Sequence, residues 1–175
     1  MKSVWSEYKS RFGVANQNLN GKLFELILAT VLIREDILPF YVSVEVAFVP
    51  NVVYDLMVHD CAAGPVCISA KTSLRERYKQ ADLEAYVLKN VHRRAKYYLV
   101  TLNHEEADSL KSKLQAGELI GIDRVVIADS TEFDELVATL KELNLCAPPK
   151  VDVFTGASSV TTEKVEHLRK RPSTR

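Results

Sequence analysis

Three polar residues stand inside segments that are otherwise apolar. Asp55 lies in "VVYDLMV", and Ser69 and Lys71 lie two residues apart in "PVCISAK". Side chains alternate between the two faces of a strand, so Ser69 and Lys71 share one face. A bare carboxylate is costly to bury, and Asp55 therefore needs a hydrogen-bond donor, a cation or a metal ion. The spacing is equally compatible with an Asp55–Lys71 salt bridge at the rim of a sheet.

Glu25 poses the same problem inside the apolar run "LFELILATVLI". Its place near the start of a predicted helix allows partial stabilisation by the helix dipole. The alternative is that Glu25 converges on the sheet with the other polar residues and forms a site with them.

A stripe of polar side chains follows Lys71. Arg77, Gln80 and Glu84 have the i, i+3, i+7 spacing that places side chains along one side of a helix. Such a stripe is ordinarily a solvated surface. This one begins just after Lys71, where a helix N-terminus would favour an anion.

The elements that position these residues are predicted from hydrophobic spacing and turn residues. A first short helix carries Val4, Trp5, Tyr8 and Phe12 and ends at Gly13. We then expect helices over residues 21–35, 73–90, 105–116 and 130–143, and strands over residues 41–49, 52–58, 65–71, 95–102 and 119–129. Three consecutive strands followed by a helical crossover to a fourth predict an α/β fold, a mixed sheet with helices packed on it.

Local signals define several ends of these elements. Asn20 is the expected N-cap of the helix over residues 21–35, which is apolar on nearly every face and should be buried. Ser73 and Glu76 form an S-x-x-E capping box, and Ser130 or Thr131 is the expected cap of the last helix. We expect one domain over residues 1–147 and a polar, basic tail over residues 148–175.

Composition narrows the function classes. The chain has 175 residues, and its 23 basic and 23 acidic residues cancel, so any polyanion site must be a local patch. The apolar run Leu26–Ile33 is far shorter than the ~20 residues that a membrane-spanning helix needs. The N-terminal residues do not look like a signal sequence, which predicts a cytoplasmic protein without membrane association.

The cysteines do not indicate a metal centre. Cys61, Cys67 and Cys146 lack CxxC spacing and are most simply reduced thiols in an intracellular protein. His59, Asp60 and Cys61 sit in a predicted turn without a distant partner, so we expect turn residues there.

Together these residues resemble the PD-(D/E)XK nuclease superfamily. The shared pattern is a helix with Glu25, a hairpin strand with Asp55, a strand ending in Lys71 and a following helix with Gln80 or Glu84. The segment "AKTSLRERYKQ" is similar to one in some type II restriction endonucleases, where Thr, a basic stretch, an aromatic residue and Gln follow the lysine. The resemblance covers about residues 21–101. It implies a restriction-endonuclease-like mixed sheet flanked by helices.

The chain departs from the superfamily pattern at two positions. Tyr54 replaces the common proline before Asp55, and Ser69 replaces the acidic residue of the (D/E)XK triplet. Some restriction enzymes of the superfamily carry Ser-x-Lys and recover the carboxylate from the following helix, where Glu84 lies. The alternative is a decayed site that no longer binds metal.

The resemblance implies Mg²⁺-dependent hydrolysis of phosphodiester bonds in DNA. Asp55, with Glu84 or Glu25, would hold the ion, because Mg²⁺ prefers hard oxygen ligands. Lys71 would position a water molecule and offset the charge that develops on the phosphoryl oxygens. Gln80 would orient the phosphate or the water, and Ser69 would only form hydrogen bonds.

Binding to DNA would use basic residues near this site. The candidates for phosphate contacts are Arg75, Arg77, Lys79, Arg93 and Arg94, which taken alone are ordinary surface charges. A double-strand cut by a one-site protein implies a homodimer. Two rivals stay open: a decayed nuclease fold that binds DNA or a partner subunit, and a structural protein in which Glu25, Asp55 and Lys71 form only an internal ion-pair cluster.

Overall fold

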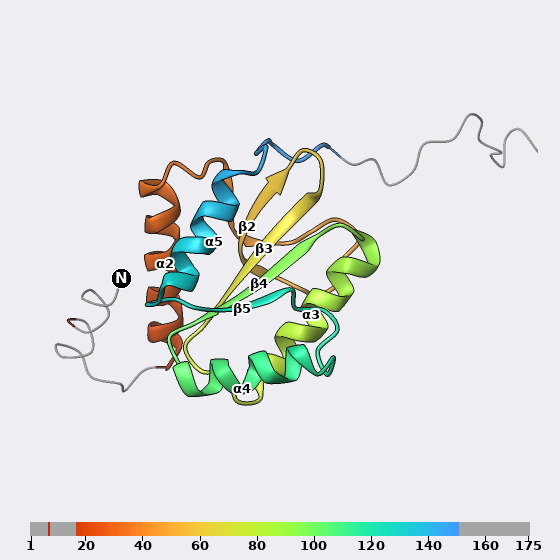
Figure 1. Ribbon diagram of the computed structural model, residues 1–175. Coiled ribbons are helices and arrows are strands. Elements are labelled where there is room, and N and C mark those ends of the chain that lie inside the picture. Colours follow the sequence, from red (N-terminus) through yellow and green to blue (C-terminus); the bar gives the residue numbers. More distant parts are fainter. Residues whose placement is uncertain (1–6, 8–16, 151–175) are drawn as a thin grey trace, which may run out of the picture.

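The computed structural model describes residue 7 and residues 17–150, which form an α/β fold (Figure 1). In chain order the elements are α2 (Gln17–Arg34), β1 (Phe40–Val44), β2 (Tyr54–Asp60), β3 (Gly64–Lys71), α3 (Arg77–Val91), β4 (Lys96–Thr101), α4 (His104–Gln115), β5 (Arg124–Ile127) and α5 (Thr131–Lys141). The first predicted helix, at Val4–Gly13, lies outside the described residues apart from Glu7.

The five strands form one mixed sheet in the order β1-β2-β3-β4-β5. The pairs β1–β2 and β2–β3 are antiparallel, whereas β3–β4 and β4–β5 are parallel. The helical crossover α3 joins the parallel strands β3 and β4, as the order of predicted elements requires. The predicted mixed sheet is confirmed.

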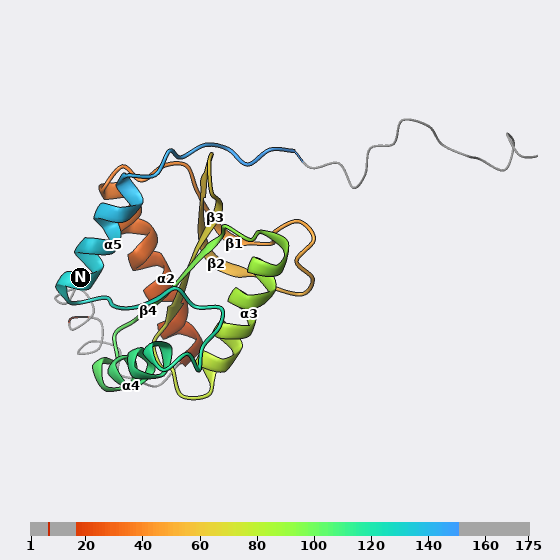
Figure 2. The same ribbon diagram turned by 45° about the vertical axis from the view of Figure 1, so that its right-hand side comes forward.

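Helices cover both faces of the sheet (Figure 2). Helices α2 and α5 pack on one face over residues such as Leu56, Val58 and Ile68. Helices α3 and α4 pack on the other face, over Met57 and Cys67. Neighbouring positions of β2 and β3 thus enter opposite cores, as strand alternation predicts.

Helix α2 differs from its prediction at both its start and its exposure. It begins at Gln17 rather than after an Asn20 cap, and Asn20 is a buried residue within the helix. Leu26 and Ile33 are 53% and 59% exposed, so the helix is not buried on every face. A single sheet can cover only one side of a helix, which leaves the opposite apolar side in solvent.

The hairpin that follows is shorter than its sequence suggests. Strand β1 ends at Val44 instead of Val49, and the backbone takes positive φ at Phe48, which a regular strand cannot contain. Val46 and Val49 still turn into the core. Strand β2 extends to Asp60, whose carboxylate accepts bonds from the N–H groups of Ala63 and Asn144, so His59 and Asp60 are strand residues and not turn residues.

The start of α3 corrects another expectation. No capping box forms, because α3 begins at Arg77 and its N-cap is Glu76. The hydroxyl of Ser73 instead donates to the carboxylate of Glu106 on α4, at 3.3 Å. By contrast Ser130 caps α5 as predicted, accepting from the N–H of Glu132.

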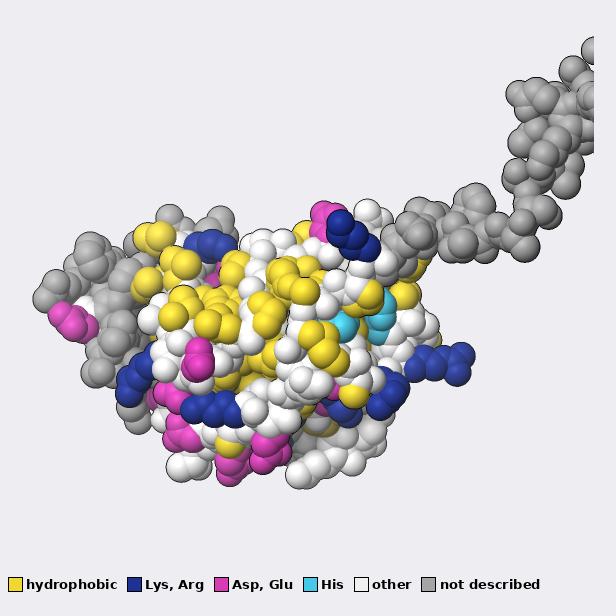
Figure 3. Space-filling model, turned by 90° about the horizontal axis from the view of Figure 1, so that it is seen from above, with side chains coloured by type: hydrophobic (Ala, Val, Ile, Leu, Met, Phe, Trp, Pro, Cys, Tyr) yellow, Lys and Arg dark blue, Asp and Glu magenta, His cyan; other side chains and the backbone are white. Residues whose placement is uncertain are grey.

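The cysteines also correct the sequence prediction. Cys61 and Cys146 form a disulfide, while Cys67 is a buried free thiol. The bond fastens residues 144–146 to the end of β2, where Leu145 also bridges to Asp60. This end of the molecule, opposite the carboxyl end of β3, is seen in Figure 3, where hydrophobic side chains gather between charged ones.

No helix among the described residues has the length and apolar character to cross a bilayer.

Candidate active site

Asp55 is held by three donors at one edge of the sheet. Its Oδ2 atom accepts hydrogen bonds from Ser69 Oγ at 3.0 Å, from the Ala70 N–H at 2.8 Å and from Lys71 Nζ at 2.9 Å. The side chains of Asp55 and Lys71 are only 15% and 16% exposed. The predicted contact between Asp55 and Lys71 is therefore present. Both the catalytic interpretation and the salt-bridge interpretation expect this contact.

The sheet topology explains why these residues meet. Asp55 lies at the start of β2 and Lys71 at the end of β3, and antiparallel pairing brings these two ends to the same edge. Strands β4 and β5 run parallel to β3, so their carboxyl ends lie at this edge as well. Open α/β sheets bind ligands outside the carboxyl ends of such strands.

A cavity of about 290 Å³ opens beside Asp55. Glu25 from α2 also lines it, so the structure brings two of the three predicted metal ligands together. Two cations also line it: Lys22, whose ammonium lies 2.9 Å from Glu25, and Arg77 at the start of α3. Gly21, Ser43 and Val53 complete the lining.

Glu84 and Gln80 do not line this cavity. Gln80 Nε2 donates to Glu84 Oε1 at 2.8 Å, and the hydroxyl of Tyr97 donates to Glu84 Oε2 at 3.1 Å. The hydroxyl of Tyr54 donates to the backbone carbonyl of Glu84 at 3.1 Å. Glu84 is therefore fastened to the sheet below α3, and Gln80 helps to hold it there.

Burial changes the ionisation of the groups around Asp55 and Glu84. The pKa of Tyr97 is raised well above its usual value, chiefly by burial and also by the Glu84 charge. The pKa of Tyr54 is raised by burial and by the proximity of Cys67 and Glu84. Burial and the charge of Asp55 raise the pKa of the Cys67 thiol, so it is a protonated core residue at neutral pH.

The donor set fits a magnesium ion only in part. Among the described residues no three His, Cys, Asp or Glu side chains converge as a metal-binding group. Mg²⁺ usually keeps several waters and needs one or two protein carboxylates plus a phosphate. Asp55 and Glu25, which share the cavity, meet that lower requirement, whereas Glu84 is engaged elsewhere.

The predicted DNA-binding residues separate into two groups. Arg77 faces the cavity, Arg75 lies 3.7 Å from Glu106, and Lys79 pairs with Glu76 at 2.9 Å. Arg93 and Arg94 are exposed beyond the far end of α3, about 20 Å along the helix from Arg77. Only Arg77 of these residues lines the cavity with Asp55.

Two residues near the site were not singled out from the sequence as functional. Tyr97 is buried in β4, and its hydroxyl donates to Glu84. Glu106 accepts bonds from Ser73 and from the Leu74 N–H, which fastens the segment after Lys71 to α4. Nothing in the spacing of the sequence points to Glu106, because its partners lie more than 30 residues away.

Comparisons of the chain with protein-family models, with curated proteins and with solved structures found no match. The candidate site is therefore judged on its own geometry.

Proposed function

We propose that this chain is a Mg²⁺-dependent deoxyribonuclease of the restriction-endonuclease-like type. The observation that carries the proposal is the cavity at the sheet edge, in which Asp55, fixed by Ser69 and Lys71, faces the same space as Glu25. A carboxylate pair, with a partly buried ammonium bonded to one of the two, suits metal-assisted hydrolysis of a phosphodiester.

The residues have separate tasks in this reaction. Asp55 and Glu25 would hold the Mg²⁺ ion, which would supply Lewis-acid activation of the phosphodiester and of a water nucleophile. Lys71 does not itself line the cavity, but its ammonium lies 2.9 Å from Asp55 Oδ2, where it would offset charge that develops on the phosphoryl oxygens. Ser69 and the Ala70 N–H fix the orientation of Asp55. Arg77, on the same cavity, provides a contact for a DNA phosphate.

We also propose that the protein forms a homodimer. A protein with one such site cuts both DNA strands as a homodimer, with a two-fold axis that matches the duplex. Helix α2 carries the exposed residues Leu19, Leu26 and Ile33 at intervals of seven, which is the spacing of a helix–helix contact. We propose this outer stripe as the dimer contact, in a cytoplasmic protein.

A second candidate function is DNA binding or partner binding by a decayed site. Two observations favour it: Ser69 stands where the superfamily pattern has an acid, and Glu84 is bonded to Tyr97 and Gln80 instead of facing the cavity. In this alternative the Asp55–Lys71 pair only stabilises the sheet edge. Metal affinity separates the two functions, because only the nuclease needs an ion at Asp55.

The experiment is a cleavage assay on plasmid and phage DNA with Mg²⁺, Mn²⁺ or EDTA. Lys71→Ala is compared with Lys89→Ala, since Lys89 is also partly buried and paired, at 2.7 Å from Asp123, but lies away from the cavity. We expect metal-dependent cutting by the wild type and Lys89→Ala that is lost in Lys71→Ala. Equal cutting by both variants would contradict the assigned role of Lys71, and absence of cutting by folded wild-type protein would favour the binding alternative.

A further inference from the structure

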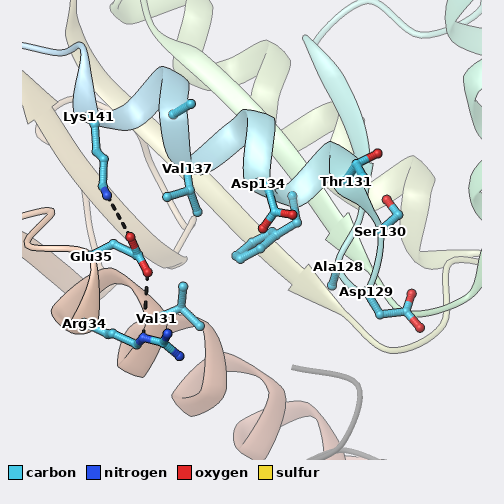
Figure 4. Close-up of a pocket in the computed structure, with 12 residues that line it drawn as sticks. Val31, Arg34, Glu35, Ala128, Asp129, Ser130, Thr131, Asp134, Val137 and Lys141 are labelled. Carbon is cyan, nitrogen blue, oxygen red and sulfur yellow. Dashed lines mark hydrogen bonds and ion pairs between the residues drawn. The ribbon is translucent and has the colours of Figure 1, made fainter.

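A large groove separates α2 from α5 on the face of the sheet away from α3 (Figure 4). Its volume is about 780 Å³, and its apolar lining comes from Val31, Ala128, Phe133, Val137 and Ala138. None of the candidate catalytic residues lines it. A groove of this size with an apolar floor is large enough to receive a helix face or an extended peptide.

The two ends of the groove differ in charge. At one end Glu35 is paired with Lys141 at 2.7 Å and lies 3.8 Å from Arg34. At the other end Asp129 and Asp134 line the groove at the start of α5 (Figure 4). Asp129 also contacts His104, at 2.7 Å from its Nε2 atom. The acidic end would therefore favour a ligand that carries cations beside its apolar surface.

The first 16 residues of the chain combine apolar and cationic side chains in this way. At about 100° per residue, Val4, Tyr8, Phe12 and Trp5 fall within one helical stripe about 100° wide. Lys9 and Arg11 flank this stripe on its two sides. Within the stretch the structure describes only Glu7, which is helical and exposed, as a residue outside the stripe should be.

The chain is long enough for this segment to reach the groove. It joins α2 at Gln17, and Val31 lies about 21 Å further along the helix axis. The helix that the sequence predicts over Val4–Phe12 would be about 12 Å long, and the four residues that follow would span up to ~13 Å if extended. The segment can therefore fold back along α2.

We propose that residues 1–16 occupy the groove between α2 and α5, with the Trp5, Tyr8 and Phe12 side chains on its apolar floor. Lys9 and Arg11 then lie toward the end that Asp129 and Asp134 line. The segment completes the covering of α2 and α5, and it is independent of the chemistry at Asp55. A second copy of the chain in the groove is the competing occupant.

Trp5 makes the proposal directly testable, because it is the only tryptophan in the chain. The emission of the full-length protein is compared with that of a synthetic peptide of residues 1–16, and both are titrated with acrylamide. We expect emission at shorter wavelength and severalfold weaker quenching in the protein. Emission and quenching equal to those of the peptide would overturn the proposal.

Matched variants locate the segment. Val137→Glu and Ala138→Glu each place a carboxylate in the groove, whereas Thr139→Glu places one on the same helix outside it, and Leu26→Glu places one on the outer stripe of α2. We expect the Trp5 emission to shift to longer wavelength in the two groove variants only, with thermal unfolding confirming that each variant is folded. A shift in Leu26→Glu alone would move the segment to the outer stripe and overturn the proposal. A short-wavelength emission that is lost on dilution, as a dimer dissociates, would assign the groove to a second copy and would also overturn it.

Discussion

At the scale of single residues, Asp55 is central to both interpretations of the sheet edge, a catalytic site or a structural ion pair. Its Oδ2 accepts three hydrogen bonds, and its side chain and that of Lys71 are largely shielded from water. A partly buried ammonium without its partner would be costly, so the pair stabilises the fold whether or not it also catalyses a reaction.

Replacing Asp55 should therefore reduce stability. For Asp55→Asn we expect the free energy of unfolding to fall by about 3 kcal/mol, because Lys71 loses its counter-charge in a shielded position. The control is Glu76→Gln, which removes the partner of Lys79 in an exposed pair and should cost less than about 1 kcal/mol. Urea denaturation measures both, and equal stability of Asp55→Asn and wild type would show that Asp55 is not the main counter-charge of Lys71.

The prediction that Ser69 and Lys71 share one face of the sheet depended on strand alternation, and it is confirmed. Ser69 and Lys71 do share a face with Asp55, because a period of two leaves no alternative once the strands are placed. The bond between Glu84 and Tyr97 could not be predicted, since it depends on how α3 is rotated against the sheet. The Lys22–Glu25 pair, by contrast, has the i, i+3 spacing of neighbours on one helix. The family resemblance implied Glu84 as a metal ligand, but Glu84 does not line the cavity that Asp55 and Glu25 share.

At the scale of elements, close packing of α3 depends on one glycine. A Cβ atom at Gly121 would lie 2.3 Å from the backbone oxygen of Asp82, and the carboxylate of Asp82 accepts from the N–H groups of Gly121 and Ile122. The segment before β5 thus lies directly on α3.

A pair of glycine substitutions tests this contact. Gly121→Ala should lower the free energy of unfolding by about 2 kcal/mol or more, because backbone atoms must move to admit the methyl group. Gly21→Ala, in α2 with no atom within 4 Å of the added Cβ, should raise it by up to about 1 kcal/mol through helix propensity. Thermal or chemical denaturation compares the two variants, and a neutral Gly121→Ala would mean that the segment before β5 is not fixed against α3.

Element boundaries were predictable where the signal was local. Ser130 caps α5 through a bond to a residue two positions away, and this cap was expected. Ser73 had an equally good local signal in Glu76, but Glu106 on α4 provides a competing acceptor and the capping box does not form. Contacts between distant segments override such short-range signals, and a single sequence does not reveal them.

At the scale of the whole molecule, the mixed sheet followed from the order of elements, but the bond that fastens the C-terminal segment did not. Cys61 and Cys146 are 85 residues apart in sequence and meet because residues 144–146 lie along the end of β2. Disulfides are uncommon in cytosolic proteins, so this bond argues against the cytoplasmic location that the sequence predicts.

The disulfide should contribute measurably to stability. In oxidising buffer we expect Cys146→Ser to unfold with a free energy lower by about 4 kcal/mol, because the bond closes a long loop in the unfolded chain. In the presence of dithiothreitol the wild type and the variant should have equal stability. A difference that persists under reduction would attribute the effect to packing of Cys146 and not to the bond.

The most direct test of the central claim is a Mn²⁺ titration followed by isothermal calorimetry, which needs no knowledge of the DNA substrate. We expect one site per chain in the wild type, loss of binding in Asp55→Asn, weaker binding in Glu25→Gln and unchanged binding in Glu84→Gln, since only the first two carboxylates line the cavity. If the wild type binds no ion, or if Asp55→Asn binds as tightly as the wild type, the cavity is not a metal centre and the account of this protein as a metal-dependent nuclease is wrong.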